Sequence, residues 1–264
     1  MIKICIVGAA GRMGRNIAAA AYEDKEVEVS GASDRNGSEY IGTPVNELAG
    51  CGKGGAVIEC DLMKCSEFAD VLIDFTGADA TFSNLPIYEK VNKPVVIGST
   101  GFSGEQKIAV EKLALKIPVI MAPNMSLGGN VALKLIEQAA SLLKGYDIEL
   151  VETHHRMKKD APSGTALAMA AAAAKGAEMD LSKHAVYSRH GIIGERKSDE
   201  IGIQTLRGGD VAGDHTVFFL GIGERIEITH RAGSGKVFAI GALRAAKWLY
   251  GRAAGLYDMS DVLG

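Results

Sequence analysis

The feature that most constrains the fold of this chain is a glycine-rich turn that directly follows a short apolar run near the amino terminus. Ile2-Lys-Ile-Cys-Ile-Val is nearly continuously apolar, as expected for a parallel strand covered on both faces. The turn ends at Gly14, and a helical pattern continues from Asn16 to Tyr22. A strand that turns this tightly into a helix places the first helical amides where they can bind a pyrophosphate. The sequence therefore predicts a dinucleotide-binding turn that consists of Gly8, Ala9, Ala10, Gly11, Arg12 and Met13.

A second apolar run, Val27 to Ala32, is followed by Asp34 and Arg35. Asp34 lies about 20 positions after Gly14, the interval at which dinucleotide folds place the carboxylate that bonds the ribose hydroxyls. An acid here favours NAD, whereas a neighbouring arginine can accept the 2′-phosphate of NADP. We therefore expect NADH or NADPH to bind at Asp34 and Arg35. The glycine spacing is GxxGxxG rather than GxGxxG, so a purely structural turn is the alternative.

Three further apolar runs start at Val71, Val95 and Pro118, and helical patterns separate them. Each run ends in small polar residues, as parallel strands do where a ligand lies across the carboxyl ends of an open sheet. Residues of the last two loops are therefore candidates to border the nicotinamide, with ordinary turn residues as the alternative. These candidates are Gly98, Ser99, Thr100, Ala122, Pro123, Asn124 and Met125.

The pattern changes after Met125. Ser126 can cap a helix that runs through Leu143, and strands joined by glycine turns follow it over residues 201–207, 215–220 and 225–230. These strands predict a mixed or antiparallel sheet, whose uncovered face can join subunits.

We predict an α/β protein with two domains. Residues 1–125 form a Rossmann-type dinucleotide-binding domain, completed by a C-terminal helix in residues 236–264. Residues 126–235 form an α+β domain that is built on the mixed or antiparallel sheet and serves substrate binding and oligomerisation.

Bases and proton donors concentrate between Val151 and Thr165. Residues 148–153 alternate with period two, which predicts a strand and sends His154 and His155 to opposite faces. This divergence, and the absence of a cysteine or acidic ligand at zinc-type spacing, argues against a metal site. Three cations come next, and a turn rich in capping residues precedes an alanine-rich helix. The cations are Arg156, Lys158 and Lys159.

A helix that starts near Ser163 leaves the amides of Ser163, Gly164 and Thr165 without partners inside the helix, and Gly164 lets a ligand approach closely. Such a helix end binds carboxylate or phosphate. Imidazole groups as a class change charge near neutral pH, so this stretch can bind an anion and give it a proton. We infer a small acidic substrate. A solvated row of cations beside an ordinary capped helix is the alternative.

Composition excludes several other classes of protein. The chain has 264 residues and a net charge of −3, which argues against nucleic-acid binding because a phosphate-tracking surface is normally basic. No apolar run reaches the roughly 20 residues that a spanning helix needs, so we expect no membrane association. The four cysteines lack a CxxC spacing, which predicts reduced thiols and a cytoplasmic location.

Taken together, the chain resembles the dihydrodipicolinate reductase family, also called 4-hydroxy-tetrahydrodipicolinate reductases, over nearly its whole length. The segment from Glu152 to Thr165 is the most specific part of this likeness. The other matching segments are Val7-Gly-Ala-Ala-Gly-Arg-Met-Gly, Asp74-Phe-Thr, Gly98-Ser-Thr-Gly-Phe, Ala122-Pro-Asn-Met-Ser, Gly223-Glu-Arg-Ile-Glu-Ile-Thr-His and Gly241-Ala-Leu-Arg.

The resemblance implies a reductase of diaminopimelate and lysine biosynthesis that uses NADH or NADPH. Such an enzyme converts 4-hydroxy-tetrahydrodipicolinate to tetrahydrodipicolinate with loss of water. By matching position, the resemblance implies that His154 is the proton donor or acceptor and Lys158 a second proton donor. It further implies that His155, Gly164 and Thr165 hold the substrate carboxylates and that the enzyme is a homotetramer.

Two other readings stay open at this point. A dehydrogenase of the aspartate or homoserine type would share the first domain without predicting His154 and Lys158 in this turn. A regulator that senses NAD(P) would bind the dinucleotide without turnover. Lys236 and Arg244 could reach a substrate carboxylate or lie in solvent, and the sequence does not separate these roles.

Overall fold

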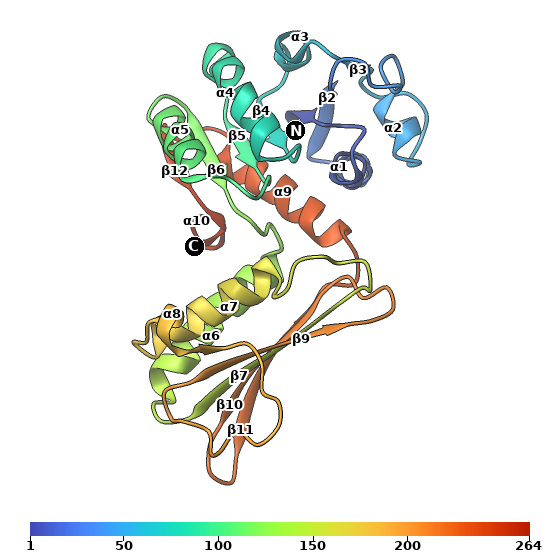
Figure 1. Cartoon of the computed structure of the whole chain (residues 1–264). Coiled ribbons are helices and arrows are strands. Elements are labelled where there is room, and N and C mark those ends of the chain that lie inside the picture. The colour runs from blue at the N-terminus through green and yellow to red at the C-terminus, as the bar shows by residue number, and fades with distance from the viewer. The chain divides into compact units, whose positions relative to one another are not determined.

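A computed structural model describes all residues, 1–264. The chain divides into two compact units, which are Met1–Leu127 with Gly235–Gly264, and Gly128–Ser234 (Figure 1). None of its helices is both long and apolar enough to cross a membrane.

The first unit is built on a seven-stranded sheet in the order β12-β6-β5-β4-β1-β2-β3, with every pairing parallel. Strands β1 to β6 lie in the order β3-β2-β1-β4-β5-β6, which is that of the doubly wound dinucleotide fold and confirms the predicted Rossmann-type sheet. Its strands are β1 (Ile2–Val7), β2 (Val27–Ser33), β3 (Ile58–Glu59), β4 (Val71–Asp74), β5 (Val95–Ile97), β6 (Pro118–Met121) and β12 (Gly255–Tyr257).

Helices cover both faces of this sheet because successive side chains of β1 point to opposite sides. Ile4 and Ile6 pack in one buried cluster with residues of α1 and α9, while Cys5 packs in another with residues of α4 and α5 (Figure 1). The helices of this unit are α1 (Arg12–Glu23), α2 (Val45–Leu48), α3 (Leu62–Ser66), α4 (Ala78–Val91), α5 (Gly104–Ala114), α9 (Lys236–Leu249) and α10 (Met259–Leu263).

The prediction of one C-terminal helix over residues 236–264 was wrong. The apolar helix α9 ends at Leu249, and β12 then adds an edge strand beside β6 before the short helix α10. β6 pairs with β5 on one side only, so its other edge offers unpaired backbone groups to which three residues of extended chain can bond.

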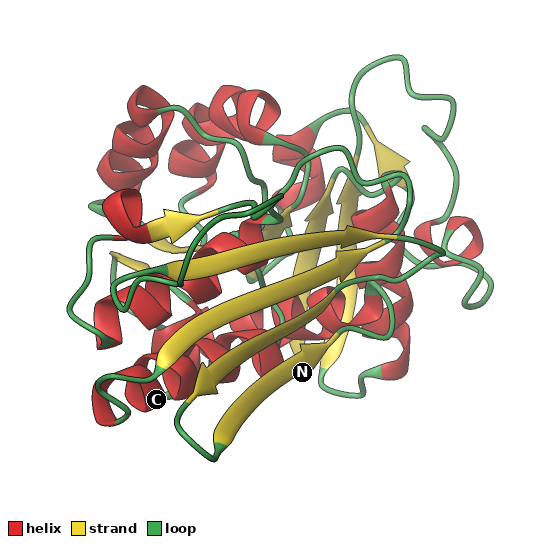
Figure 2. Cartoon of the chain, turned by 60° about the horizontal axis from the view of Figure 1, so that its bottom comes forward, coloured by secondary structure: helices red, strands yellow, loops and turns green.

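The second unit holds a five-stranded mixed sheet in the order β11-β10-β7-β9-β8 (Figure 2). β7 lies at its centre, antiparallel to β10 and parallel to β9. The strands are β7 (Asp147–His154), β8 (Ala185–Val186), β9 (Ile201–Arg207), β10 (Asp214–Leu220) and β11 (Arg225–Arg231), and the helices are α6 (Leu127–Leu142), α7 (Gly164–Gly176) and α8 (Leu181–His184).

Helices α6 and α7 cover one face of this second sheet (Figure 1). Every second residue of β7 is buried, and Ile148 and Leu150 pack in a cluster with Ile136 of α6 and Met169 of α7. The same alternation continues to Glu152 and His154, which are 0% and 7% exposed. The covered face of β7 therefore changes from apolar to polar toward its carboxyl end.

Candidate active site

The glycine turn of the first unit has the backbone that its sequence predicts. Gly8 adopts φ +76°, and a Cβ there would lie 2.7 Å from Cγ2 of Thr76. A Cβ on Gly14 would lie 2.3 Å from the carbonyl oxygen of Gly8, so the turn closes onto the start of α1 only with glycine at both positions. Gly11 caps α1 without any side-chain hydrogen bond, which leaves the amino end of this helix open to an anion.

A cavity of about 580 Å³ lies over this turn. Asp34 and Arg35 stand on its wall, and Oδ2 of Asp34 accepts a hydrogen bond of 3.2 Å from the amide of Ala10. The carboxylate is thus anchored beside the turn, where ribose hydroxyls would meet it. The lining of the cavity fits a nicotinamide dinucleotide. It includes Gly8, Gly11, Asp34, Arg35, Cys60, Asp61, Phe75, Thr76, Ser83 and Asn84.

The other residues expected at the cofactor lie elsewhere around the turn and the sheet. Within the turn, Ala9 and Ala10 are buried. At the start of α1, Arg12 is exposed and Met13 is half-buried. The two loops expected to border the nicotinamide do not contribute to the cavity wall. Sequence analysis missed several residues of that wall, among them Cys60, Asp61 and Asn84. Cys60 and Asp61 follow β3, a strand of only two residues that leaves no pattern in the sequence, and Asn84 lies within α4.

The loop after β5 is held by its neighbours. A Cβ on Gly98 would lie 2.1 Å from the ring of Phe75, so the ring occupies the space of a side chain there. Thr100 is exposed. Ser99 is 6% exposed, and its hydroxyl is engaged in hydrogen bonds within the protein, so only its backbone is available to a ligand.

The loop after β6 mixes buried and accessible residues. Ala122 and Met125 belong to the buried core of the first unit. Pro123 is exposed, and Oδ1 of Asn124 accepts a hydrogen bond of 2.8 Å from the amide of Ser126. Pro123 is therefore the exposed residue of this loop that a cofactor could contact.

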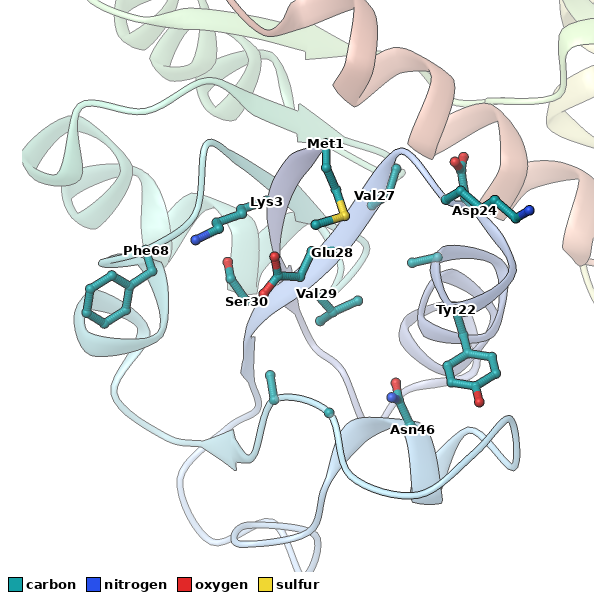
Figure 3. A pocket seen from close by; sticks show the side chains of 14 residues that line it. Met1, Lys3, Tyr22, Asp24, Val27, Glu28, Val29, Ser30, Asn46 and Phe68 are labelled. Carbon is teal, nitrogen blue, oxygen red and sulfur yellow. The ribbon is translucent and has the colours of Figure 1, made fainter.

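A larger cavity of about 670 Å³ lies at the opposite end of β1 and β2 (Figure 3). Lys3 and Glu28 extend from the two strands, and Tyr22 and Phe68 stand on its rim. Ligands of open α/β sheets bind at the carboxyl ends of the strands. We therefore assign the cofactor to the smaller cavity over the glycine turn.

In the second unit, the covered face of β7 ends in a carboxylate–imidazole pair. Oε2 of Glu152 lies 2.5 Å from Nδ1 of His154. Arg207 donates two hydrogen bonds to the carboxylate, at 2.8 and 3.0 Å, and the amide of Ser163 donates one at 3.1 Å. Burial alone would raise the pKa of Glu152, but these hydrogen bonds lower it below its usual value. Glu152 is therefore ionised, and the hydrogen on Nδ1 of His154 points to it.

A second histidine completes this cluster. The rings of His154 and His215 meet edge to face with centroids 5.1 Å apart, and Nε2 of His215 lies 2.9 Å from Oγ of Ser163. Burial, followed by the neighbouring His154, lowers the pKa of His215 to about 4. His215 is therefore neutral at physiological pH, and its ring does not compete with His154 for charge.

The sequence predicts an anion site at the start of α7. Ser163 caps this helix, since its Oγ accepts a hydrogen bond of 3.1 Å from the amide of Ala166. Gly164 is exposed, and no atom lies within 4 Å of the position of a Cβ on it. Thr165 is half-buried beside it. Ser163 also bonds Glu152, so the helix end adjoins the carboxylate–imidazole pair.

The remaining predicted residues flank this cluster. Nζ of Lys158 lies 3.0 Å from the exposed carboxylate of Asp160, and the Lys158 side chain is 21% exposed. His155 is half-buried, and its amide donates to the carbonyl of Val211. No group of three His, Cys, Asp or Glu side chains is placed to hold a metal ion.

Two residues of this cluster have no role in the sequence-based prediction. Sequence analysis gave His215 no functional part, and it did not consider Arg207. The strand register brings them in, because His215 lies opposite Glu152 on β10 and Arg207 opposite His154 on β9. Lys236 and Arg244 belong to α9 in the first unit, where Lys236 donates to Glu23 at 2.7 Å.

Comparisons with known proteins agree with this geometry. The family model for the N-terminus of dihydrodipicolinate reductase matches residues 2–125, and the model for the C-terminus matches residues 128–263. The 4-hydroxy-tetrahydrodipicolinate reductases of Syntrophotalea carbinolica and Geobacter sulfurreducens are each 49% identical to the chain, and each alignment covers 100% of this chain and 99% of the relative.

A solved structure gives the same result. Dihydrodipicolinate reductase from Paenisporosarcina sp. TG-14, with dipicolinate bound, superposes with a TM-score of 0.75 at 25% identity, covering 98% of this chain and 97% of that one. Both halves of the sequence, and the fold that they form, thus match one family of reductases. The chain belongs to the dihydrodipicolinate reductase family.

Proposed function

We infer that this protein reduces 4-hydroxy-tetrahydrodipicolinate to tetrahydrodipicolinate, with loss of water, in diaminopimelate and lysine biosynthesis. The observation that carries this inference is the buried pair of Glu152 and His154 beside the amino end of α7, where Gly164 is exposed. Such an arrangement can hold a carboxylate and exchange a proton with the same small molecule.

The nicotinamide cofactor, NADH or NADPH, supplies the hydride when bound. The glycine turn and the amino end of α1 would hold its pyrophosphate, and Asp34 its ribose hydroxyls. Arg35, on the same wall, would accept the 2′-phosphate of NADPH. Both forms therefore have a partner in this cavity.

His154 is the proton-exchanging residue of the substrate site. Glu152 accepts the hydrogen on Nδ1, which leaves Nε2 as the atom that takes up or gives a proton. A Cβ on Gly213 would lie 2.9 Å from Nε2, so a side chain at this position would crowd the nitrogen that exchanges protons.

Substrate carboxylates are held by the amides of Gly164 and Thr165 at the start of α7 and by His155. Ser163 serves as the cap that fixes the helix end, through its bonds to Ala166 and Glu152. The ammonium group of Lys158 is the second proton donor, in addition to His154. To act, it must leave its ion pair with Asp160 and contact the substrate.

We further propose that the protein is a cytoplasmic homotetramer. The face of the second sheet opposite α6 and α7 carries Val151, Thr216 and Phe218, and association of subunits through this face would cover them. Gel filtration with light scattering tests the assembly.

The reaction is tested by following NADH or NADPH oxidation by the purified protein, supplied with the condensation product of pyruvate and aspartate semialdehyde. Oxidation that requires both precursors is expected. Oxidation with aspartate semialdehyde alone, whose aldehyde can accept the hydride, would instead support a different dehydrogenase. Binding of NADH without any oxidation would support a sensing role.

A further inference from the structure

A cluster of buried polar side chains lies at the carboxyl ends of β4 and β5, behind the cofactor cavity. Its members are Asp74, Thr81, Tyr88 and Ser99, each 6% exposed or less. Thr76, which is exposed on the cavity wall, joins it from the outside. We name these five residues the Asp74 cluster. Nothing in the proposed chemistry uses them, and buried polar groups are costly unless they are fully bonded.

Asp74 lies at the centre of the Asp74 cluster. Its Oδ1 accepts hydrogen bonds from the amide and the hydroxyl of Thr76, at 2.8 and 2.7 Å. Its Oδ2 accepts a hydrogen bond of 2.6 Å from the hydroxyl of Tyr88 on α4. Burial, and then the Asp74 carboxylate, raise the pKa of Tyr88 well above its usual value, so the phenol keeps its proton and remains a donor.

Ser99 connects this carboxylate to the loop after β5. Its hydroxyl accepts hydrogen bonds from the amide of Gly77, at 2.9 Å, and from Thr81, at 2.8 Å, and it lies 3.5 Å from Oδ1 of Asp74. The backbone adds one more link, because the amide of Gly98 donates to the carbonyl of Asp74 at 2.9 Å. The loops after β4 and β5 are therefore tied to each other through side chains that solvent does not reach.

The Asp74 cluster also reaches the glycine turn. Cγ2 of Thr76 occupies the space in which a Cβ on Gly8 would stand, 2.7 Å away. Thr76 thus packs on the turn expected to hold the pyrophosphate, while its hydroxyl and amide are bound to Asp74. The loops after β4 and β5 thus share one buried carboxylate, and the glycine turn packs against the first of them.

We propose that Asp74, Tyr88 and Ser99 are positioning residues for the nicotinamide cofactor, holding the loop at Thr76 and Gly77, which reaches the cavity wall through Thr76, in its binding conformation before the cofactor arrives. The proposal rests on the proposed function only in that the cofactor is NADH or NADPH. These residues do not touch the cofactor themselves, since they lie beneath the surface that it contacts. Loops fixed in advance spare binding the cost of ordering them, which strengthens affinity.

The proposal is tested on the full-length protein with Tyr88→Phe and Ser99→Ala, and with Ser99→Thr as the variant that keeps the hydroxyl. Val110→Ala is the control, because Val110 is fully buried on α5 in the same unit and lies outside the cluster. The dissociation constant of NADH is measured by fluorescence, stability by thermal unfolding, and local opening by hydrogen exchange of the Gly77 amide without cofactor.

Loss of a hydrogen bond to a charged group corresponds to about a 10-fold or greater change in an equilibrium constant. We expect Tyr88→Phe and Ser99→Ala to raise the dissociation constant of NADH about 10-fold. Exchange at Gly77 should accelerate in Ser99→Ala and return toward wild type in Ser99→Thr. Val110→Ala should lower thermal stability with no change in either reading.

An unchanged dissociation constant in folded Tyr88→Phe or Ser99→Ala, together with lowered stability, would make the cluster merely structural and overturn the proposal. If Tyr88→Phe does not fold, the two Ser99 variants decide alone. Failure of the proposed function shows up separately, as wild-type protein that binds NADH but does not oxidise it with substrate. The positioning role is judged on binding and exchange and does not depend on that result.

Discussion

Nδ1 of His154 lies 2.5 Å from Oε2 of Glu152, a carboxylate with no exposed surface that also receives both terminal nitrogens of Arg207. This relationship determines which nitrogen of the imidazole does chemistry. Since an ionised carboxylate only accepts hydrogen bonds, Nδ1 carries the hydrogen and Nε2 is left to exchange protons. Arg207 in turn holds the carboxylate in its charged form.

Glu152→Gln should therefore impair catalysis without contact to substrate. A carboxylate only accepts and so fixes the hydrogen on Nδ1 of His154, whereas an amide can either accept or donate there, so we expect kcat to fall about 10- to 100-fold. NADH affinity should stay unchanged. Steady-state rates and NADH titration measure the two effects. A variant with full kcat would show that the pair has no catalytic part.

His154→Gln should flatten the pH–rate profile and lower kcat by about 10²- to 10⁴-fold, the usual contribution of a general acid or base. Steady-state rates from acidic to basic pH measure this. His184→Gln serves as a control, because His184 lies on α8 and belongs to neither the substrate site nor the cofactor site. An unaltered profile would remove His154 from the mechanism.

Lys158→Ala should lower kcat sharply, by about 10²-fold or more, while NADH still binds. Its neighbour Lys159 is exposed, so Lys159→Ala supplies a matched loss of charge. We expect Lys159→Ala to keep nearly full turnover. Equal turnover in the two variants would reject the role of Lys158 as a proton donor.

His215 should make the protein less stable in mild acid. Its pKa is about 4 in the folded state against 6.5 for the exposed side chain, so the unfolded chain binds the extra proton first. The stabilising contribution is complete above pH 6.5 and is lost as the pH falls toward 4. The free energy of unfolding should drop by up to about 3 kcal/mol over this range.

Urea unfolding of wild type and His215→Gln at several pH values measures this effect. The variant should be less stable at neutral pH, where its partner Ser163 loses the imidazole, and should show a flatter dependence on pH between 6.5 and 4. Parallel curves for the two proteins would contradict the assignment of the buried, neutral state.

Arg35→Ala should weaken NADPH more than NADH. Arg35 lines the cofactor cavity beside Asp34, where the 2′-phosphate, which NADH lacks, would give the guanidinium an anionic partner. A loss of about 10-fold in NADPH affinity is expected. Titration of each cofactor by fluorescence measures the ratio, and equal losses for both would mean that this side chain does not contact the phosphate.

Local sequence patterns were enough to predict much of this molecule. The glycine turn, the strands on either side of it and the alternation of β7 each depend on residues adjacent in the chain, so a reader of the sequence can recognise them. The same holds for α7, which begins at Gly164, one residue from its predicted start near Ser163. The predicted site residues Gly8, Asp34, His154 and Ser163 lie in these elements or directly beside them.

What the sequence alone determined, then, is that a dinucleotide turn and a stretch of proton donors occur in one chain. Tertiary structure decided the partners: strand register sets Arg207 and His215 around Glu152, and the sheet order brings Ser99 to Asp74 from a different strand. It also turned residues 255–257 into an edge strand. Local patterns follow from covalent neighbours, whereas these contacts depend on pairings between distant segments that no single segment encodes.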